Sequence, residues 1–308
     1  MKHFINLKDI PAKDLRKIIT DTKKRKSLRK KLSTLEVDKG APLKGKLLIQ
    51  MFEKSSLRTR LSFYLAIRQL GGGTLTLRSN ELHLGQGGES IADTAKILST
   101  YGDGFMIRTD SEKKIDDFNK YLSIPLINGL SPLSHPTQVL SDIFTVEEIK
   151  KKNISKLNIS WIGDSNNVLN SLISAALKFN FNLNIGCPKN YRSANLSKNN
   201  IKFDKKICFF ESPKKAIQEA DVVFSDKFVS LNDKVNKLKK IRDFKNYKID
   251  LKLFNCAKPD AIFLHCLPRG DEVSDDVFFG KKSYVWKQAQ NRIHVQKSIL
   301  LFCFGKLR

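Results

Sequence analysis

The chain has few cysteines, and they do not follow the patterns that hold disulfides or metal ions. Only five occur among 308 residues, at widely spaced positions and without a Cys-x-x-Cys pair. An odd number with this spacing disfavours both a disulfide scaffold and a zinc site. We therefore expect reduced thiols at these positions: Cys187, Cys208, Cys256, Cys266 and Cys303.

Long apolar runs are also missing. No segment reaches the roughly 18 apolar residues that a membrane-spanning helix requires. Residues 1–9 contain no apolar stretch typical of a secretory leader, so we expect a cytoplasmic protein that does not act on a membrane. The apolar content of 41% is ordinary for a globular protein. A chain of this length can form two domains of about 150 residues each.

Acidic residues are scarce relative to basic ones: 31 Asp and Glu against 56 Lys and Arg give a formal charge of +25. Such an excess is compatible with nucleic-acid binding, because cations neutralise backbone phosphates. The basic clusters, however, lie in separate regions and lack interleaved aromatic residues for stacking on bases. We expect a solvated basic surface rather than specific nucleic-acid binding. The main clusters are 23–26, 29–31, 150–152 and 237–240.

Strand-like and helix-like segments alternate along the chain, with a probable boundary in the polar stretch 150–156. Strands are expected at 46–52, 74–77, 105–107, 125–127, 158–162, 183–186, 207–210, 221–224 and 261–264. Helices are expected from Pro11 and at about 56–70, 90–101, 112–122, 135–150, 166–179, 213–220 and 289–304. This alternation predicts an α/β protein with two doubly wound parallel-sheet domains.

Polar residues follow several of the expected strands. They are 56–59, Arg108, 164–167, Asp226 and 265–266. In doubly wound sheets ligands bind beyond the carboxyl ends of the strands. We therefore expect these residues to line a cleft between the two domains.

Residues 52–60, Phe-Glu-Lys-Ser-Ser-Leu-Arg-Thr-Arg, connect the first of these strands to a helix. The first N–H groups of a helix have no partner within it and face an anion favourably. Ser56 and Thr59 add hydroxyl donors, and Arg58 adds a guanidinium group that fits two phosphate oxygens. The alternative is an ordinary Ser-capped helix with solvated arginines. The segment predicts a phosphate site.

Three further segments carry polar residues in a distinctive order. They are His-Pro-Thr-Gln-Val-Leu-Ser-Asp at 135–142, Asp-Lys-Phe-Val-Ser-Leu-Asn at 226–232 and His-Cys-Leu-Pro at 265–268. Gln138 lies three residues beyond His135, so one helix face presents both to a small ligand. Together with 52–60, these segments resemble the motifs of the aspartate/ornithine carbamoyltransferase family, in its ornithine branch. The resemblance covers nearly the whole chain.

The resemblance implies transfer of a carbamoyl group from carbamoyl phosphate to the δ-amine of ornithine, giving citrulline and phosphate in arginine biosynthesis. It implies a homotrimer that needs neither a metal nor an organic cofactor. Residues 1–134 and a returning carboxyl-terminal helix, 289–308, would bind carbamoyl phosphate. Residues 135–288 would bind ornithine, with helix 135–150 bridging the two domains.

The resemblance also implies two sets of site residues. The carbamoyl phosphate set is Ser56, Leu57, Arg58, Thr59, His83, Arg108, His135, Gln138 and Arg292. The ornithine set is Asn167, Asp226, Ser230, Leu231, Cys266 and Leu267. Within these sets the resemblance assigns catalysis to Arg108, His135 and Cys266: the first two face the carbonyl oxygen of carbamoyl phosphate, and Cys266 accepts from the δ-amine.

Several positions depart from the family pattern. Leu57 replaces a usual Thr, His83 stands where a Gln usually reaches a neighbouring subunit, and 231–232 is Leu-Asn instead of Met-Gly. These departures leave two alternatives: a carbamoyltransferase for another amine, such as an acylated ornithine, and a degenerate, non-catalytic paralogue. A nicotinamide enzyme is disfavoured, because 163–167 lacks the second and third glycines of a dinucleotide-binding loop. Taken alone, Cys266 could equally be a small buried apolar residue.

Overall fold

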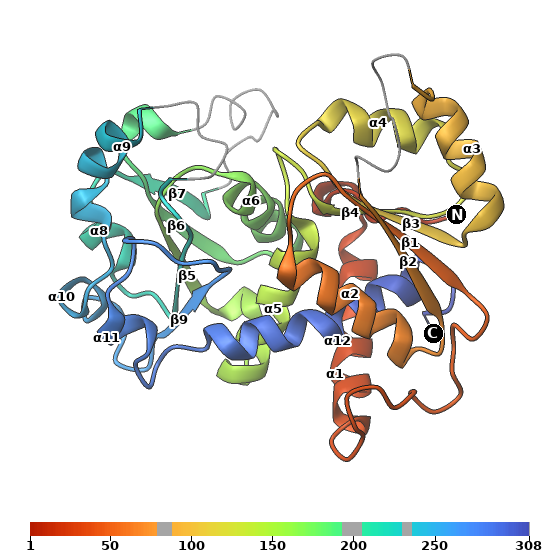
Figure 1. Cartoon of the computed structure of the whole chain (residues 1–308). Helices are drawn as coiled ribbons and strands as arrows, with labels where there is room; N and C mark the ends of the chain where they lie inside the picture. The colour runs from red at the N-terminus through yellow and green to blue at the C-terminus, as the bar shows by residue number, and fades with distance from the viewer. Residues whose placement is uncertain (79–87, 193–204, 230–235, 308) are drawn as a thin grey trace. The chain divides into compact units, whose positions relative to one another are not determined.

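The computed structural model describes the chain except for residues 79–87, 193–204, 230–235 and 308. The chain forms two compact units (Figure 1). Unit 1 comprises Met1–Phe144 and Gln290–Arg308, and unit 2 comprises Thr145–Ala289. The chain passes from one unit to the other within two helices, α5 (Pro136–Lys150) and α12 (Val285–Cys303).

Unit 1 is built on a parallel sheet of four strands in the order β2-β1-β3-β4. The strands are β1 (Leu47–Phe52), β2 (Gly73–Arg78), β3 (Gly104–Arg108) and β4 (Leu126–Leu130). The helices confined to this unit are η1 (Leu7–Asp9), α1 (Ala12–Leu28), α2 (Leu57–Gln69), α3 (Ile91–Tyr101) and α4 (Glu112–Tyr121). Residues 48–52 of β1 are all buried, as their apolar run requires in a central strand.

The first long helix buries the face that its apolar spacing predicts. Leu15 and Ile18 are fully buried and Ile19 is 4% exposed, while Lys13 and Lys17 lie on the exposed face. Since the three apolar residues recur at positions i, i+3 and i+4, they share one side of the helix. The helix therefore packs through apolar contacts and presents charge to solvent.

Unit 2 contains a parallel sheet of five strands in the order β7-β6-β5-β8-β9. The strands are β5 (Asn158–Ile162), β6 (Asn182–Gly186), β7 (Ile207–Phe210), β8 (Val222–Ser225) and β9 (Ile262–His265). The helices are η3 (Ile154–Lys156), α6 (Asn167–Phe179), η4 (Lys189–Tyr191), α8 (Pro213–Ile217), α9 (Lys237–Asp243), η5 (Lys245–Tyr247), α10 (Leu251–Phe254) and α11 (Asp275–Phe278). Its core is rich in aromatic residues, and Phe228 stacks on Phe244 with ring centroids 4.8 Å apart.

The expected fold class is confirmed: both sheets are parallel, and the carboxyl-terminal residues belong to unit 1. Two helix boundaries differ from expectation. The last helix begins at Val285 instead of residue 289. The helix expected at 213–220 ends at Ile217, because Gln218 is extended and Glu219 takes a φ of 58°. No helix among the described residues combines the length and apolar composition that a membrane crossing requires.

Candidate functional site

Three loops of unit 1 lie at one edge of its sheet. In the register of the parallel strands, Phe52 at the end of β1 pairs with Arg108 at the end of β3, and Arg108 pairs with Leu130 at the end of β4. The carboxyl ends of neighbouring parallel strands meet at the same edge. The loops that follow β1 and β4, which lead to Thr59 and His135, therefore start beside Arg108.

The loop after β1 enters helix α2 as the phosphate prediction requires. Leu57 is the first helical residue, and the N-cap Ser56 is extended, with a φ of −152°. Within the described part of the chain, the Ser56 side chain accepts no hydrogen bond from the first turn of α2. Ser56 therefore does not act as an ordinary side-chain cap. Thr59 is fully buried, whereas Leu57 is 71% exposed.

Arg292 connects the phosphate loop to helix α5. Its Nη2 donates to Thr59 Oγ1 at 2.9 Å, and its Nη1 donates to Gln138 Oε1 at 2.9 Å. Gln138 Nε2 donates in turn to Asp142 Oδ1, one turn further along α5, at 2.8 Å. All four side chains are at most 3% exposed. Such a buried, linked set holds the guanidinium group in one orientation.

Arg108 lies at an irregularity in the sheet. The register between β3 and β4 shifts between Ile107 and Arg108, leaving Gly129 as the extra residue. A Cβ atom on Gly129 would stand 2.5 Å from Met106 Sδ, so only glycine fits there. Bulges of this kind redirect side chains, and Arg108 Nη1 lies 3.5 Å from Thr59 Oγ1.

His135 is the focus of the positive charge in unit 1. It is buried, and burial lowers its pKa well below the ordinary value; the charges of Arg292, Arg108 and Arg58 lower it further. The imidazole is therefore neutral at neutral pH and can donate a hydrogen bond without carrying a charge. The guanidinium groups of α2, β3 and α12 thus act on one ring.

The turn that leads to His135 is held by a small buried polar network. Asn128 Nδ2 donates to Ser134 Oγ at 2.9 Å and to Ser131 Oγ at 3.2 Å. The backbone N–H of Ser131 donates to the carbonyl of Ser134. This network positions the residue immediately before His135.

The candidate acceptor residues of unit 2 also follow neighbouring strands. Strand β8 pairs with β9 so that Ser225 lies opposite His265, and Asp226 and Cys266 come directly after them. Strand β5, on the other side of β8, leads to Asn166 and Asn167. Asn166 Nδ2 donates to Asp226 Oδ2 at 2.7 Å, while its Oδ1 caps helix α6. The Asp226 carboxylate is therefore held at the start of α6.

The Cys266 loop is fixed by the residue before it. The backbone N–H of Leu267 donates to His265 Nδ1 at 3.0 Å, and His265 Nε2 lies 3.1 Å from Glu272 Oε1. Burial raises the pKa of Glu272, but hydrogen bonds from His265 and Gly270 outweigh it and leave this pKa below the ordinary value. Leu267 takes a φ of 60°, which a branched residue adopts only when its surroundings hold it. Cys266 itself is half-buried rather than enclosed in the core.

A buried ion pair lies beside this edge. Lys240 of α9 is 2% exposed, and its Nζ is 2.7 Å from Asp164 Oδ2 in the loop after β5. The carbonyl of Asp164 accepts from Trp161 Nε1 at 3.1 Å. The pair ties helix α9 to the loop that carries Asn166 and Asn167.

The structure groups the described candidates into one set in each unit. In unit 1 it brings together Thr59, Arg108, His135, Gln138 and Arg292, and places Ser56, Leu57 and Arg58 where α2 begins. In unit 2 it places Asn167, Asp226, Cys266 and Leu267 after neighbouring strands. Three candidates, His83, Ser230 and Leu231, lie outside the described residues, as does Asn232.

Sequence reasoning missed three side chains that hold the candidates. Asp142 stands one helical turn from Gln138 within the quoted segment 135–142, so the i, i+4 spacing was a usable signal. Asn166 was visible as a cap before a helix. Glu272 had no local signal, because its partner His265 comes from a different strand end. Among the described residues, no group of three or more His, Cys, Asp or Glu has a metal-binding arrangement.

Both halves of the chain match known protein families. Residues 2–148 match the model of the aspartate/ornithine carbamoyltransferase carbamoyl-P binding domain, and residues 155–303 match the model of the Asp/Orn binding domain of the same family. The ornithine carbamoyltransferase of Mesorhizobium japonicum is 40% identical over 311 residues, covering 99% of both chains. That of Ruthia magnifica is 42% identical over 305 residues, covering 98% of this chain and 99% of the relative.

Solved structures agree with these matches. Ornithine carbamoyltransferase from Pyrococcus furiosus superposes with a TM-score of 0.90 at 36% identity, covering 99% of this chain and 97% of that chain. The anabolic ornithine carbamoyltransferase from Campylobacter jejuni gives a TM-score of 0.89 at 36% identity, with full coverage of both chains.

Proposed function

Because this chain belongs to the aspartate/ornithine carbamoyltransferase family, we propose that it is an ornithine carbamoyltransferase. It transfers the carbamoyl group of carbamoyl phosphate to the δ-amine of ornithine and yields citrulline and phosphate. The amine nitrogen bonds to the carbonyl carbon, the carbon–oxygen bond to phosphate breaks, and phosphate leaves with the electron pair. The attacking nitrogen loses its surplus proton.

Unit 1 supplies the groups for carbamoyl phosphate. The first turn of α2, Arg58 and Thr59 hold the phosphate, while Arg108 and the neutral His135 donate toward the carbonyl oxygen. Negative charge develops on this oxygen and then on the departing phosphate, so preoriented donors stabilise the transition state. A neutral imidazole suits this position, since it adds a donor without another charge beside the arginines.

Arg292 and Gln138 act as a coupled pair in this proposal. Arg292 contributes charge to the phosphate side and is held by Thr59 and Gln138. Gln138 is oriented by Asp142 and faces the carbamoyl amide. Their mutual hydrogen bonds support a site that is formed before substrate arrives, which lowers the cost of reorganisation during reaction.

Unit 2 supplies the groups for the amine. Asp226 takes the ammonium group of ornithine, and Asn167 binds its α-carbon groups, with Ser230 and Leu231 completing this part of the pocket. Cys266 and the carbonyl of Leu267 accept hydrogen bonds from the δ-amine and direct its lone pair at the carbamoyl carbon. The His265–Glu272 contact and the Asn166–Asp226 bond keep these acceptors in place.

The observation that carries this assignment is the grouping of three guanidinium groups around the buried His135, with Arg292 bonded to both Thr59 and Gln138. A carbamoyl-transfer assay over a panel of amines tests it. Ornithine should be the preferred acceptor, with turnover strictly dependent on carbamoyl phosphate. Preference for an acylated ornithine, or no transfer to any amine, would instead support one of the two alternatives.

We further propose a homotrimer that works in the cytoplasm in arginine biosynthesis, with His83 of each subunit reaching a neighbouring site. The similarity to an enzyme described as anabolic supports this direction. Sedimentation equilibrium tests the trimer. Growth of an arginine auxotroph lacking its own ornithine carbamoyltransferase, when supplied with this chain, tests the direction in the cell.

A further inference from the structure

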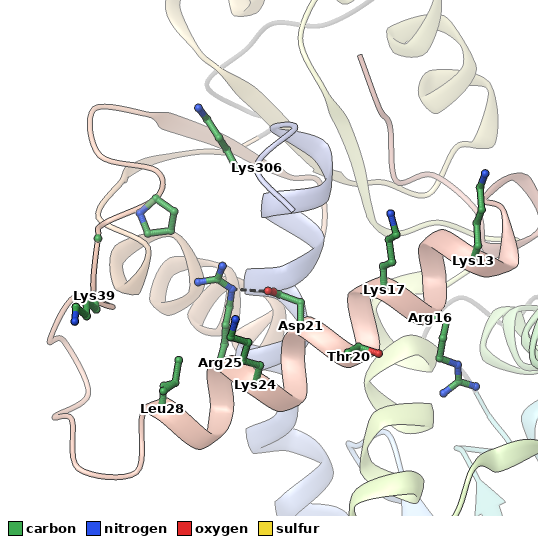
Figure 2. A pocket seen from close by; sticks show the side chains of 12 residues that line it. Lys13, Arg16, Lys17, Thr20, Asp21, Lys24, Arg25, Leu28, Lys39 and Lys306 are labelled. Carbon is green, nitrogen blue, oxygen red and sulfur yellow. Dashed lines mark hydrogen bonds and ion pairs between the residues drawn. The ribbon is translucent and has the colours of Figure 1, made fainter. Parts of the chain in front are cut away.

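We propose that a basic groove on unit 1 binds a linear chain of phosphate groups, of the kind found in inorganic polyphosphate. The groove has a volume of about 1020 Å³ and is lined from three segments: helix α1, residues 39–42, and the residues after α12 (Figure 2). None of the residues assigned above to either substrate lines it. It is therefore separate from the carbamoyl transfer site.

Positive charge dominates this groove. Its basic lining residues are Lys13, Arg16, Lys17, Lys24, Arg25, Lys39 and Lys306. Asp21 is the single carboxylate among the described lining residues, and its Oδ2 already accepts from Arg25 Nε at 2.8 Å and from Ser298 Oγ at 2.7 Å. The carboxylate thus offsets Arg25 and leaves the other cations without compensation from this residue.

The lysines of the groove are available to an anion. Within the described part of the chain, no carboxylate pairs with Lys13, Lys17, Lys24, Lys39 or Lys306, and all five are exposed. Lys13, Lys17 and Lys24 recur at i, i+4 and i+11 along α1, so they share one helix face. At 1.5 Å per residue they span roughly 16 Å, which a single phosphate ion cannot bridge. A linear ligand with several charges fits this spacing.

The chemistry of the lining favours phosphates over nucleobases and membranes. None of the described lining residues is aromatic, and none is Asn or Gln, so the groove offers neither stacking nor paired hydrogen bonds to base edges. The apolar face of α1 is buried in unit 1, with Leu15 and Ile18 fully covered, so the helix cannot insert into a bilayer. A concave basic surface instead suits a flexible polyanion.

The test is a binding titration with inorganic tripolyphosphate and with a longer inorganic polyphosphate. The groove variant carries Lys17→Ala, Lys24→Ala and Lys306→Ala. A control variant carries Lys152→Ala, Lys214→Ala and Lys215→Ala, which removes the same charge from exposed positions of unit 2. A third variant, Arg58→Ala, reports binding at the phosphate loop.

We expect the longer chain to bind more tightly than tripolyphosphate, and the groove variant to lose about tenfold or more in affinity. With about 0.7 counterions released per contact, its salt slope should fall by about 2. The control and Arg58→Ala should change affinity by less than about twofold, since charges beyond a Debye length are screened. Equal loss in the control would reduce the effect to net charge and overturn the proposal.

Two other outcomes also overturn it. A selective loss in Arg58→Ala would place polyphosphate at the phosphate loop instead of the groove. Tighter binding of single-stranded RNA than of polyphosphate with the same number of phosphates would mean that bases, not phosphates, are recognised. Because the groove shares no residue with the transfer site, failure here leaves the proposed carbamoyl transfer untouched.

Discussion

The two units arrange their buried charge differently. In unit 1 three guanidinium groups gather around His135 and lower its pKa. In unit 2 buried charges meet partners of opposite sign: Lys240 with Asp164, and His265 with Glu272. Gathered like charges favour an anion as the missing partner, whereas opposite charges in contact satisfy one another. Unit 1 is thus organised to act on an anionic ligand, and the pairs in unit 2 hold loops in position.

The largest effect should come from removing one of the gathered charges. We expect Arg58→Ala to lower kcat/KM for carbamoyl phosphate by about 10³-fold, or about 4 kcal/mol, because a charge-assisted donor to the leaving phosphate is lost. Steady-state kinetics measures this. Arg68→Ala, an exposed arginine in the last turn of the same helix, is the matched control. Near-normal activity of Arg58→Ala would contradict the assigned role.

Breaking an opposite-charge pair should affect stability instead. Asp164→Asn leaves the buried Lys240 without its carboxylate, so the unfolding free energy should fall by about 3 kcal/mol. Urea denaturation measures this change. The double variant Asp164→Asn with Lys240→Met should recover most of the loss, because the buried charge is then gone. If the single variant is as stable as wild type, the pair does not hold this loop.

The acceptor side should respond in only one substrate. Asp226→Asn should raise KM for ornithine about 30-fold, or about 2 kcal/mol, since a charged hydrogen-bond acceptor for the ammonium group is lost. Carbamoyl phosphate affinity, measured by calorimetry, should change by less than about twofold. Asp276→Asn, an exposed carboxylate of α11 in the same unit, is the control. Comparable weakening of both substrates would argue against separate roles for the two units.

A smaller gain is expected from restoring a hydroxyl to the phosphate loop. Leu57 begins helix α2 and is 71% exposed, so Leu57→Thr adds a donor beside the phosphate without disturbing the core. We expect about fivefold tighter carbamoyl phosphate binding, or about 1 kcal/mol. Leu61→Thr, also exposed on α2, should leave binding unchanged. Unaltered binding in Leu57→Thr would mean that the side chain at 57 does not reach the phosphate.

The smallest effect concerns pH. Burial and the nearby arginines hold the pKa of His135 well below its ordinary value, so the ring is neutral above that lowered pKa. Its imidazole proton resonance, assigned with His135→Asn, should therefore stay in place as pH falls from about 7.5 through about 6.5, where an unperturbed histidine titrates. Adding Arg292→Ala should move the titration upward. A midpoint near 6.5 in the wild type would mean that the arginines do not act on this ring.

Local patterns predicted much of this molecule because they depend on neighbours in the chain. The run at 46–52 and the spacing of Leu15, Ile18 and Ile19 specified a buried strand and a helix face that the structure contains. The early start of α12 at Val285 was missed, because the exposed Trp286 and Lys287 interrupt the apolar pattern that marks the rest of the helix. Helix α9 was likewise missed, although Asn236 caps its first turn.

The sequence by itself determined the succession of strands and helices, the polar residues at the strand ends and the family resemblance, since these rest on periodicity and on residue types at close spacing. Only the tertiary structure decided which partners each site residue has. Arg292 reaches Thr59 across 233 positions of sequence, and Gln138 across 154. The bulge at Gly129 and the contact of His265 with Glu272 are equally invisible locally. Such contacts depend on strand order and register, which bring distant segments together.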